Sequence, residues 1–334
     1  MPIIETADAC AETWPLIAPF RISRGTKTEA TVVTVTLSAD GHQGRGECCP
    51  YARYGESVAD TLAALRAFDW QPFAGLDLAA TRHALGQCLP PGSVRNALDC
   101  ALWDLCAKTT RTPVWELAGL PRPAAAVTCY TLSLDTPDAM ATQALQHADC
   151  SLLKLKLGDG RNDAARMQAV RDARPDASLV CDANEGWSTD DLAHLIGVAT
   201  ECRFELIEQP LAENDDVALA TLTPGVPICA DEAAAPGTAI ANLAPRYQAV
   251  NIKLDKVGGL TAAIEAIAEA RRLGLKIMVG SMVSTSLSMA PAALLGGLAD
   301  WIDLDSPLLL ARDRSHGMRI THGRLAPPSS DLWG

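Results

Sequence analysis

Short apolar runs alternate with amphipathic stretches along the chain from about residue 125 onward. Each run is followed by a segment in which apolar residues recur at helical spacing. The predicted strands cover residues 127–134, 152–157, 179–184, 204–209, 228–231, 250–254, 277–282 and 301–305. Consecutive βα units in this number favour a closed (β/α) barrel over an open doubly wound sheet. No Gly-x-Gly-x-x-Gly follows the first strand, which also argues against a dinucleotide-binding fold.

The chain up to about residue 110 has the pattern of a separate α+β unit. Residues 30–37 form a β-branched run that ends in a turn at 39–41, and a second strand is predicted near 43–49. Residues 93–108 carry one apolar stripe at helical spacing, and Ser93 is the expected N-cap of this helix.

Two further segments are expected to be irregular, and a third is expected near the end of the chain as a short strand and a turn. Residues 14–27 and 50–56 combine Pro and Gly with basic or aromatic residues, so we expect both to be loops. Loops of this composition often contact ligands. Residues 318–325 have the pattern of a short strand and a turn, which could bring the end of the chain back to the first unit.

Composition narrows the classes of partner. The 334 residues are 48% hydrophobic and 20% charged, which is ordinary for a soluble globular protein. The net charge of −12, with no basic cluster, argues against nucleic acid and anionic membrane surfaces as partners. No signal peptide or membrane-spanning segment is recognisable. The eleven cysteines include no Cys-x-x-Cys, and we expect free thiols in a reducing cytoplasm.

Acidic side chains stand at the ends of three successive predicted strands. They are Asp182, Glu208 and Asp231, with Asn184 and Glu232 beside them in the sequence. In a barrel these ends converge, and three buried carboxylates repel one another unless a cation neutralises them. An all-oxygen set without nearby Cys or His favours Mg²⁺ over zinc or copper. The alternative is that each acid caps the helix that follows it, a common use of Asp.

Three lysines occur within predicted strands. Lys154 and Lys156 lie at i and i+2 and therefore point to the same face, and Lys253 stands in a later strand. Repulsion between neighbouring ammonium groups, together with desolvation, is expected to lower a lysine pKa so that it can act as a base. An edge strand whose lysines face water is the alternative. In a barrel, the strands of Lys156 and Lys253 lie on opposite sides of the acidic strands, which suits inversion of a carbon acid.

These residues together resemble the enolase superfamily, muconate-lactonizing-enzyme subgroup. The matching motifs are Lys154-x-Lys156, Asp182-x-Asn184, Glu208-Gln-Pro, Asp231-Glu232 and Asn251-Ile-Lys253, with a further match over residues 95–105. The resemblance implies a modified (β/α)7β TIM-type barrel at 116–315. It also implies an α+β capping domain formed by residues 1–115, to which the tail 316–334 returns.

The resemblance also implies chemical roles. One Mg²⁺ per subunit would be held by Asp182, Glu208 and Asp231, next to Asn184 and Glu232, and the reaction would pass through an enolate. Lys156 and Lys253 would be the acid/base pair. Lys154 would lower the pKa of Lys156.

Substrate-binding residues are suggested by two further motifs. Asp303 and Asp305, at i and i+2 in the last strand, look like the Asp-x-Asp motif with which dipeptide epimerases bind the free ammonium group; alternatively, Asp305 only opens the turn before Pro307. Arg24 resembles the capping-loop arginine that pairs with a glutamate side chain in L-Ala-D/L-Glu epimerases. Arg21 and Arg53 are rival candidates.

The resemblance therefore predicts an isomerase, a dipeptide epimerase acting on L-Ala-D/L-Glu in murein peptide recycling. Many lactonizing relatives carry a Glu shortly after the seventh strand, where this chain has Ser284, which weakens a cycloisomerase reading. N-Acylamino acid racemase and o-succinylbenzoate synthase activities stay open, as does a Schiff-base lysine aldolase from another class. A small-molecule dipeptide is the expected partner, and the oligomeric state is left open, a homo-oligomer included.

Overall fold

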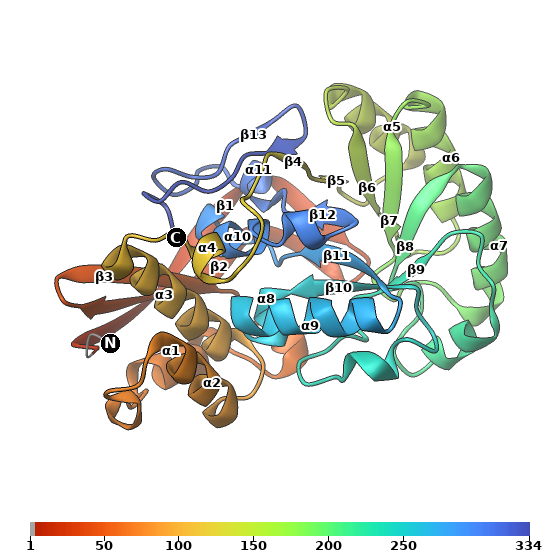
Figure 1. Ribbon diagram of the computed structural model, residues 1–334. Coiled ribbons are helices and arrows are strands. Elements are labelled where there is room, and N and C mark those ends of the chain that lie inside the picture. Colours follow the sequence, from red (N-terminus) through yellow and green to blue (C-terminus); the bar gives the residue numbers. More distant parts are fainter. Residues whose placement is uncertain (1–3) are drawn as a thin grey trace.

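In the computed structural model, which describes residues 4–334 without the side chains of residues 78 and 79, parallel strands form a nearly closed barrel (Figure 1). In order around the barrel the strands are β5 (Tyr130–Leu132), β6 (Leu152–Lys156), β7 (Ser178–Asp182), β8 (Phe204–Glu208), β9 (Ile228–Ala230), β10 (Ala249–Lys253), β11 (Lys276–Gly280) and β12 (Trp301–Asp303). Between β12 and β5, the backbone N–H of Cys129 donates to the carbonyl of Ile302 at 2.8 Å. The predicted barrel and all eight of its predicted strands are confirmed.

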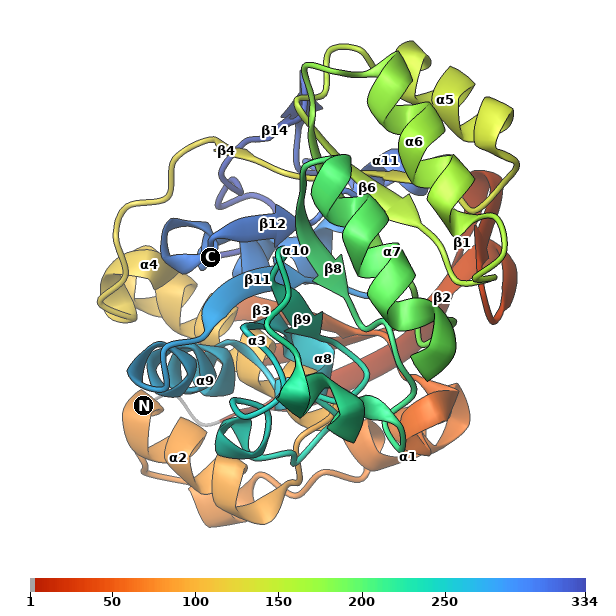
Figure 2. The same ribbon diagram turned by 90° about the vertical axis from the view of Figure 1, so that its right-hand side faces the viewer.

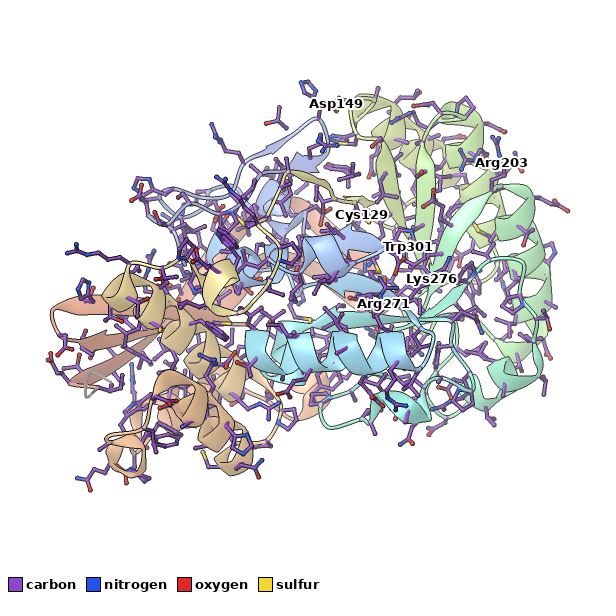
Figure 3. All side chains as sticks on the ribbon, viewed as in Figure 1. Cys129, Asp149, Arg203, Arg271, Lys276 and Trp301 are labelled. Atoms are coloured by element: carbon purple, nitrogen blue, oxygen red, sulfur yellow. The ribbon has the colours of Figure 1, made fainter. Side chains whose placement is uncertain are left out.

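The inside of the barrel is filled by a layer of apolar side chains, one from each strand or from the residue just before it. This layer consists of Cys129, Leu152, Val180, Leu206, Cys229, Ala249, Met278 and Trp301. Figure 3 labels Cys129 and Trp301, which lie at the first and last positions of this ring. Because side chains alternate between the two faces of a strand, the residue two positions later in each strand also points inward. This layer therefore lies beneath those later residues and forms the apolar floor of the barrel mouth.

Helices cover the outside of the barrel (Figure 2). They are α5 (Pro137–Gln146), α6 (Asp163–Ala173), α7 (Thr189–Glu201), α8 (Leu254–Val257), α9 (Leu260–Arg272), α10 (Ser286–Ala293) and α11 (Ser306–Leu309). The connections after β8 and β9 contain only the 3-10 turns η3 (Asp216–Thr221) and η4 (Ile240–Asn242), and η5 (Gly296–Leu298) precedes β12. Two of the expected βα units are thus less regular than the pattern predicts.

The N-terminal unit is a sheet of three antiparallel strands packed against helices. The strands are β1 (Thr6–Ile22), β2 (Gly25–Ala39) and β3 (His42–Cys48). The helical elements are η1 (Ala52–Tyr54), α1 (Val58–Arg66), η2 (Gln71–Phe73), α2 (Leu78–Cys88), α3 (Ser93–Thr110) and α4 (Val114–Leu117). The predicted α+β character of this unit is confirmed.

Two expectations for this unit are wrong in detail. Residues 14–27 are not a loop but the end of a long hairpin around its turn, and the β1–β2 register shifts between Pro15 and Phe20. An edge strand such as β1 tolerates prolines, because its outer N–H groups have no strand partner. Ser93 is the first residue of α3 rather than its N-cap; its backbone N–H and hydroxyl both donate to the Glu56 carboxylate at 2.7 Å.

Helix α3 joins the two parts of the molecule. The Asp99 carboxylate accepts hydrogen bonds from the N–H and the hydroxyl of Thr261, at the start of α9. Asn96 donates to Asp255 at 2.8 Å, and Arg95 donates to the carbonyl oxygens of Val257 and Gly258. The residues 95–105 that carried part of the resemblance therefore fix the sheet unit on the barrel.

The C-terminal tail forms a hairpin and then returns to α3. Strands β13 (Ile320–Thr321) and β14 (Arg324–Leu325) pair with β4 (Ala126–Val127), which precedes the first barrel strand. Further on, the indole N–H of Trp333 donates to the Cys100 carbonyl at 3.1 Å. The C-terminal end of the chain lies on the side of the antiparallel sheet (Figure 1). The domain boundaries at 115/116 and 315/316 stay a prediction. Within residues 4–334, no helix is long and apolar enough to cross a membrane.

Candidate active site

The polar side chains of the site stand directly above the apolar floor. Lys154, Asp182, Glu208, Asp231, Asn251 and Asp303 each follow a floor residue by two positions in the sequence. The alternation of the strands therefore turns all of them inward, at the carboxyl ends where barrel enzymes place their chemistry. Gly280 occupies this position in β11, where an added Cβ would lie 2.6 Å from the side-chain oxygen of Asn251. The missing side chain leaves room for Asn251, which donates to Glu208 at 2.7 Å.

Asp182, Glu208 and Asp231 form a group that fits a metal ion. One carboxylate oxygen from each lies within 4.8 Å of the others, and all three residues are buried. Burial and the charges of Asp182 and Asp231 raise the pKa of Glu208 to about 7. Buried acceptors nearby, Asn184 Oδ1 and Glu232 Oε2, have no hydrogen-bond partner among the described residues. An oxygen-rich, negatively charged cage of this kind suits a hard divalent cation with bound water.

Lysine side chains surround these carboxylates. Lys154 is fully buried, with its Nζ 2.5 Å from Glu208 Oε2 and 2.6 Å from Asp303 Oδ2. The Nζ of Lys156 lies 2.5 Å from Asp182 Oδ2. On the other side, the Nζ of Lys253 lies 2.7 Å from Asp231 Oδ2. Each ammonium group is thus paired with a carboxylate from another strand or loop.

The expectation of a lowered pKa in the Lys154/Lys156 pair is not met for Lys154. Burial favours the neutral amine of Lys154, but the charges of Asp303, Glu208 and Asp182 outweigh it and raise the pKa well above its usual value. The pKa of Lys253 is also raised, because Asp231 and Glu208 outweigh its burial. The physical reason is that the Nζ of each of these two lysines lies within 2.7 Å of at least one carboxylate oxygen. The predicted role of Lys154, to lower the pKa of Lys156, stays a prediction.

The two candidate bases lie on opposite sides of the acidic strands. Lys156 ends β6 and Lys253 ends β10, with β7, β8 and β9 between them in the barrel. Both lysines line one cavity of about 280 Å³, together with Asp231 and Glu232. A small molecule in this cavity would have an amine on either side of it.

Residues of the N-terminal unit form the other wall of this cavity. They are Phe20, Ile22, Arg24, Gly25, Thr26, Lys27, Tyr51 and Tyr54. The Arg24 guanidinium donates to Glu232 at 2.5 Å and to the Asn184 carbonyl at 2.8 Å. It also pairs with Glu185 at 3.1 Å, and Arg53 pairs with the same carboxylate at 2.6 Å. The tip of the β1–β2 hairpin and the η1 turn are therefore both anchored to the loop after β7.

Of the three arginines considered from the sequence, Arg24 is the one in the wall of this cavity. Arg21 pairs with Asp135 at 3.3 Å and lines a different cavity. Arg53 contacts Glu185 but is not among the lining residues.

The two acids of β12 have different partners. Asp303 accepts the hydrogen bond from Lys154, whereas Asp305 accepts one from the backbone N–H of Thr131 at 2.6 Å. Burial and the charge of Asp303 raise the pKa of Asp305 to about 7. Both acids are buried, and Asp305 lies beside β5 rather than only opening a turn. The structure thus places two acidic groups at one edge of the metal-binding group.

Sequence reasoning missed several residues that hold the site together. The buried Lys256 donates to both the side chain and the carbonyl of Asp231. Gln209 accepts from the backbone N–H groups of Asp231 and Ala233. A signal was available for Lys256, since it follows Lys253 by three residues within an apolar segment. Gln209 has a positive φ of 35° and Asn184 has one of 44°, so the backbone is strained at these two residues of the site.

Comparisons with known proteins match this geometry over nearly the whole chain. The family profile described as "Enolase C-terminal domain-like" matches residues 138–331, and the one described as "Mandelate racemase / muconate lactonizing enzyme, N-terminal domain" matches residues 4–119. The L-Ala-D/L-Glu epimerase of Escherichia coli K12 is 42% identical over 96% of this chain and 99% of its own length. An N-acetyl-D-glutamate racemase of a Pseudoalteromonas species is 39% identical over 91% and 95%.

A solved structure shows the same likeness in three dimensions. The crystal structure of an enolase family member from Agrobacterium tumefaciens, with homology to dipeptide epimerases, has a TM-score of 0.93 to this chain at 45% identity. The match covers 98% of this chain and 99% of that one. That structure holds sodium and L-Ala-L-Glu, with an ordered loop.

Proposed function

The chain belongs to the enolase superfamily, in the mandelate racemase/muconate lactonizing enzyme family, and from this premise we propose that it is a Mg²⁺-dependent dipeptide epimerase acting on L-Ala-D/L-Glu. The observation that carries the proposal is the position of Lys156 and Lys253 on opposite sides of three buried carboxylates. Amines on both faces of a bound carbon acid allow one to remove the α-proton and the other to return a proton from the opposite face. The outcome is inversion at that carbon.

The three carboxylates and the two lysines have different roles in the proposed reaction. Mg²⁺ held by Asp182, Glu208 and Asp231 would stabilise the negative charge that develops on the substrate carboxylate as the α-proton leaves. Sites of this superfamily use a Lys or His base with Mg²⁺. Asp182 and Asp231 are also the partners of Lys156 and Lys253. If Asp231 shared its charge with a cation, it would stabilise the ammonium group of Lys253 less, so the pKa of Lys253 would fall toward the range of a useful base.

The remaining polar groups fit the two ends of a dipeptide. Asp303 and Asp305 would accept the free α-ammonium, because two carboxylates at short range are good acceptors for a cation. Arg24 would bind the side-chain carboxylate of glutamate, with Lys27 as a second cation in the same wall. Tyr51 and Tyr54 would cover the substrate and exclude water.

We extend the proposal to the setting of the reaction. The similar enzyme of Escherichia coli is named for L-Ala-D/L-Glu, and this supports a role in murein peptide recycling. All eleven cysteines are free thiols, several of them buried, and this supports a reducing cytoplasm.

Substitution of each lysine tests the two-base proposal. Lys156→Ala and Lys253→Ala should each abolish epimerisation, because proton removal and return need different groups. One variant should still exchange the α-proton of one isomer in D₂O, since its remaining lysine can remove and return a proton on a single face. The measurements are polarimetry for epimerisation and mass shift for exchange. Full epimerase activity in either variant, or activity that survives metal removal by EDTA, would end the proposal.

A second candidate, racemisation of an N-acylated glutamate, is favoured by the 39% identity to an N-acetyl-D-glutamate racemase. The two candidates differ in the free ammonium group that only the dipeptide has. Asp305→Asn should lower kcat/KM for L-Ala-L-Glu by about 10-fold to 100-fold, as expected for a lost charged hydrogen bond of roughly 1.5–3 kcal/mol. It should leave N-acetyl-L-glutamate turnover unchanged. A wild-type enzyme that prefers N-acetyl-L-glutamate, and a variant that does not affect dipeptide turnover, would favour the racemase instead.

A further inference from the structure

A second cavity, of about 680 Å³, lies away from the lysines and carboxylates of the active site. Its walls come from β1, from β5, from the turn after α5 and from the turn of the C-terminal hairpin. Phe20 lines both this cavity and the smaller one of the active site. Among the side chains in its wall that carry metal-binding atoms are His147, Asp149, Cys150 and His322. The proposed function uses none of them.

Three of these side chains are close enough to share one ion, and the fourth, His322, contacts one of the three. Ligand atoms of His147, Asp149 and Cys150 lie within 4.8 Å of one another. His322 Nδ1 is 3.4 Å from Asp149 Oδ2, and Cys150 Sγ is 3.8 Å from Asp149 Oδ1. Zinc bound at about 2.0 Å to nitrogen and about 2.3 Å to sulfur brings its ligands to spacings of this size. The Asp149 and His322 side chains are 52% and 76% exposed, so both are free to move onto an ion.

Hydrogen bonds from a buried arginine fix the turn that carries three of these residues. Arg174 is buried and donates to the carbonyl oxygens of Ala144, His147 and Cys150. Its charge is balanced by Asp176, which it contacts through two hydrogen bonds of 2.9 and 2.8 Å. The His147 ring also stacks on Tyr130, with 3.7 Å between the ring centroids. The backbone and one imidazole are therefore fixed before any ion binds.

The fourth residue comes from the other end of the chain. His322 and Gly323 form the two-residue turn between β13 and β14, with positive φ values of 50° and 65°. Asn-Gly is the usual pair in such a turn, and His in the first position accepts some strain. Gly323 packs against the turn, because a Cβ there would lie 3.1 Å from the Cys150 Cα. Asp149 is labelled in Figure 3, between the β13–β14 hairpin and α5.

We propose that His147, Asp149, Cys150 and His322 bind a Zn²⁺ ion. Two imidazoles, a thiolate and a carboxylate are the ligand types that zinc takes in a four-coordinate site. The Cys150 thiol gives up its proton to solvent on binding, and the ion takes the resulting lone pair. The ion ties the C-terminal hairpin to the turn between α5 and β6. With one thiolate and one carboxylate among its ligands, the bound ion neutralises the charge of Asp149 in the wall of the 680 Å³ cavity.

Cobalt(II) substitution tests the site, because a thiolate ligand gives Co²⁺ a strong charge-transfer absorption that oxygen ligands do not. Untagged protein is titrated with Co²⁺ in excess Mg²⁺, which keeps Asp182, Glu208 and Asp231 occupied. One equivalent of Co²⁺ should produce the thiolate band, and one equivalent of Zn²⁺ should remove it. Cys150→Ser should lose the band, whereas Cys88→Ser, which changes an exposed thiol in α2, should keep it.

A second variant separates metal binding from folding. His322→Asn removes the imidazole but supplies a residue that favours the same turn. Its Zn²⁺ affinity should fall by about 10-fold or more, since even groups one step removed from a metal contribute that much. Epimerase activity with Mg²⁺ should be unchanged in both variants, which keeps this test separate from that of the proposed function. A Co²⁺ spectrum without a thiolate band, or a band that survives Cys150→Ser, would overturn the proposal.

Discussion

The four lysines of the barrel mouth share their carboxylate partners with the expected cation. Lys154 contacts Glu208 and Asp182, Lys156 contacts Asp182, and Lys253 and Lys256 both contact Asp231. A divalent ion and an ammonium group therefore compete for the same oxygen atoms. Binding of the ion would weaken the contact with Asp231 that raises the pKa of Lys253. Metal binding and the basicity of Lys253 would thus be coupled through this one carboxylate.

Arg24 is the residue proposed to bind the glutamate side chain of the substrate. Arg24→Ala should lower kcat/KM for L-Ala-L-Glu by about 10-fold to 100-fold, because a charged hydrogen bond of roughly 1.5–3 kcal/mol to the glutamate side chain is lost. Turnover of L-Ala-L-Ala, which has no such carboxylate, should change little. The measurement is a pair of kcat/KM values for each enzyme.

The matched control for this substitution is Arg53→Ala. Arg53 contacts the same Glu185 carboxylate as Arg24 but does not line the active-site cavity. It should not alter the preference between the two dipeptides. An equal loss for both dipeptides in Arg24→Ala would mean that the arginine only anchors the hairpin.

At the scale of elements, the contact between α3 and the antiparallel sheet depends on glycines. A Cβ at Gly46 would lie 2.0 Å from the Ala97 carbonyl oxygen, and one at Gly44 would lie 2.3 Å from that of Ala101. Gly46→Ala should therefore lower the free energy of unfolding by about 1–3 kcal/mol, the usual cost of overpacking. Denaturant unfolding measures the change.

Gly197 in α7 is the control for this prediction. A Cβ there meets no atom within 4 Å, and alanine is the better helix former. Gly197→Ala should leave the protein as stable or stabilise it by about 0.5–1 kcal/mol. Equal effects at both positions would show that the close approach of α3 does not limit stability.

The strands were predictable because each combines an apolar run with a polar end. All eight predicted barrel strands are present, although their bounds differ by a few residues. The hairpin at 14–27 could not be read from the chain, because Pro15 and Pro19 are normally evidence against a strand. These prolines are tolerated because β1 lies at the edge of the sheet, and that position is determined by the tertiary structure. The 3-10 turns η3 and η4 were equally hidden by a pattern that suggested regular helices.

At the scale of the whole molecule, one buried acid contributes to the contact between the N-terminal unit and the barrel. Asp255, in α8, accepts hydrogen bonds from the backbone N–H of Cys49 and from Asn96. Burial raises the pKa of Asp255 to about 7, although both hydrogen bonds oppose the shift. A carboxyl whose pKa is higher in the folded than in the unfolded state stabilises the fold most below its unfolded pKa of about 4. That contribution is lost as the pH rises from about 4 to about 7.

Asp255→Asn should remove this pH dependence. The amide oxygen can accept both hydrogen bonds, and the side chain no longer ionises. Compared with the wild type, the variant should gain stability between pH 5 and pH 8, with a slope of at most about 1.4 kcal/mol per pH unit. Thermal or denaturant unfolding at the two pH values gives the difference. A constant difference between the two proteins would show that Asp255 is not the titrating group.

The sequence predicts which residues belong to the candidate site better than it predicts the contacts between them. Alternation along each strand is enough to bring Lys154, Asp182, Glu208 and Asp231 to one end of the barrel. Which lysine meets which acid depends on strand register and on side-chain length, so the raised pKa values of Lys154 and Lys253 could not be read from the chain. Contacts between distant segments, such as Arg24 with Glu185, were hidden for the same reason.

The hairpin formed by β1 and β2 has a consequence for enzyme engineering. Its tip supplies Arg24 and Lys27 to the cavity, whereas the two lysines proposed as bases and the three carboxylates belong to the barrel. A combinatorial library confined to residues 20–27 would therefore vary the recognition of the second amino acid and leave the proton-transfer machinery intact. Selection from such a library offers a route to epimerases for new dipeptides on an unchanged catalytic scaffold.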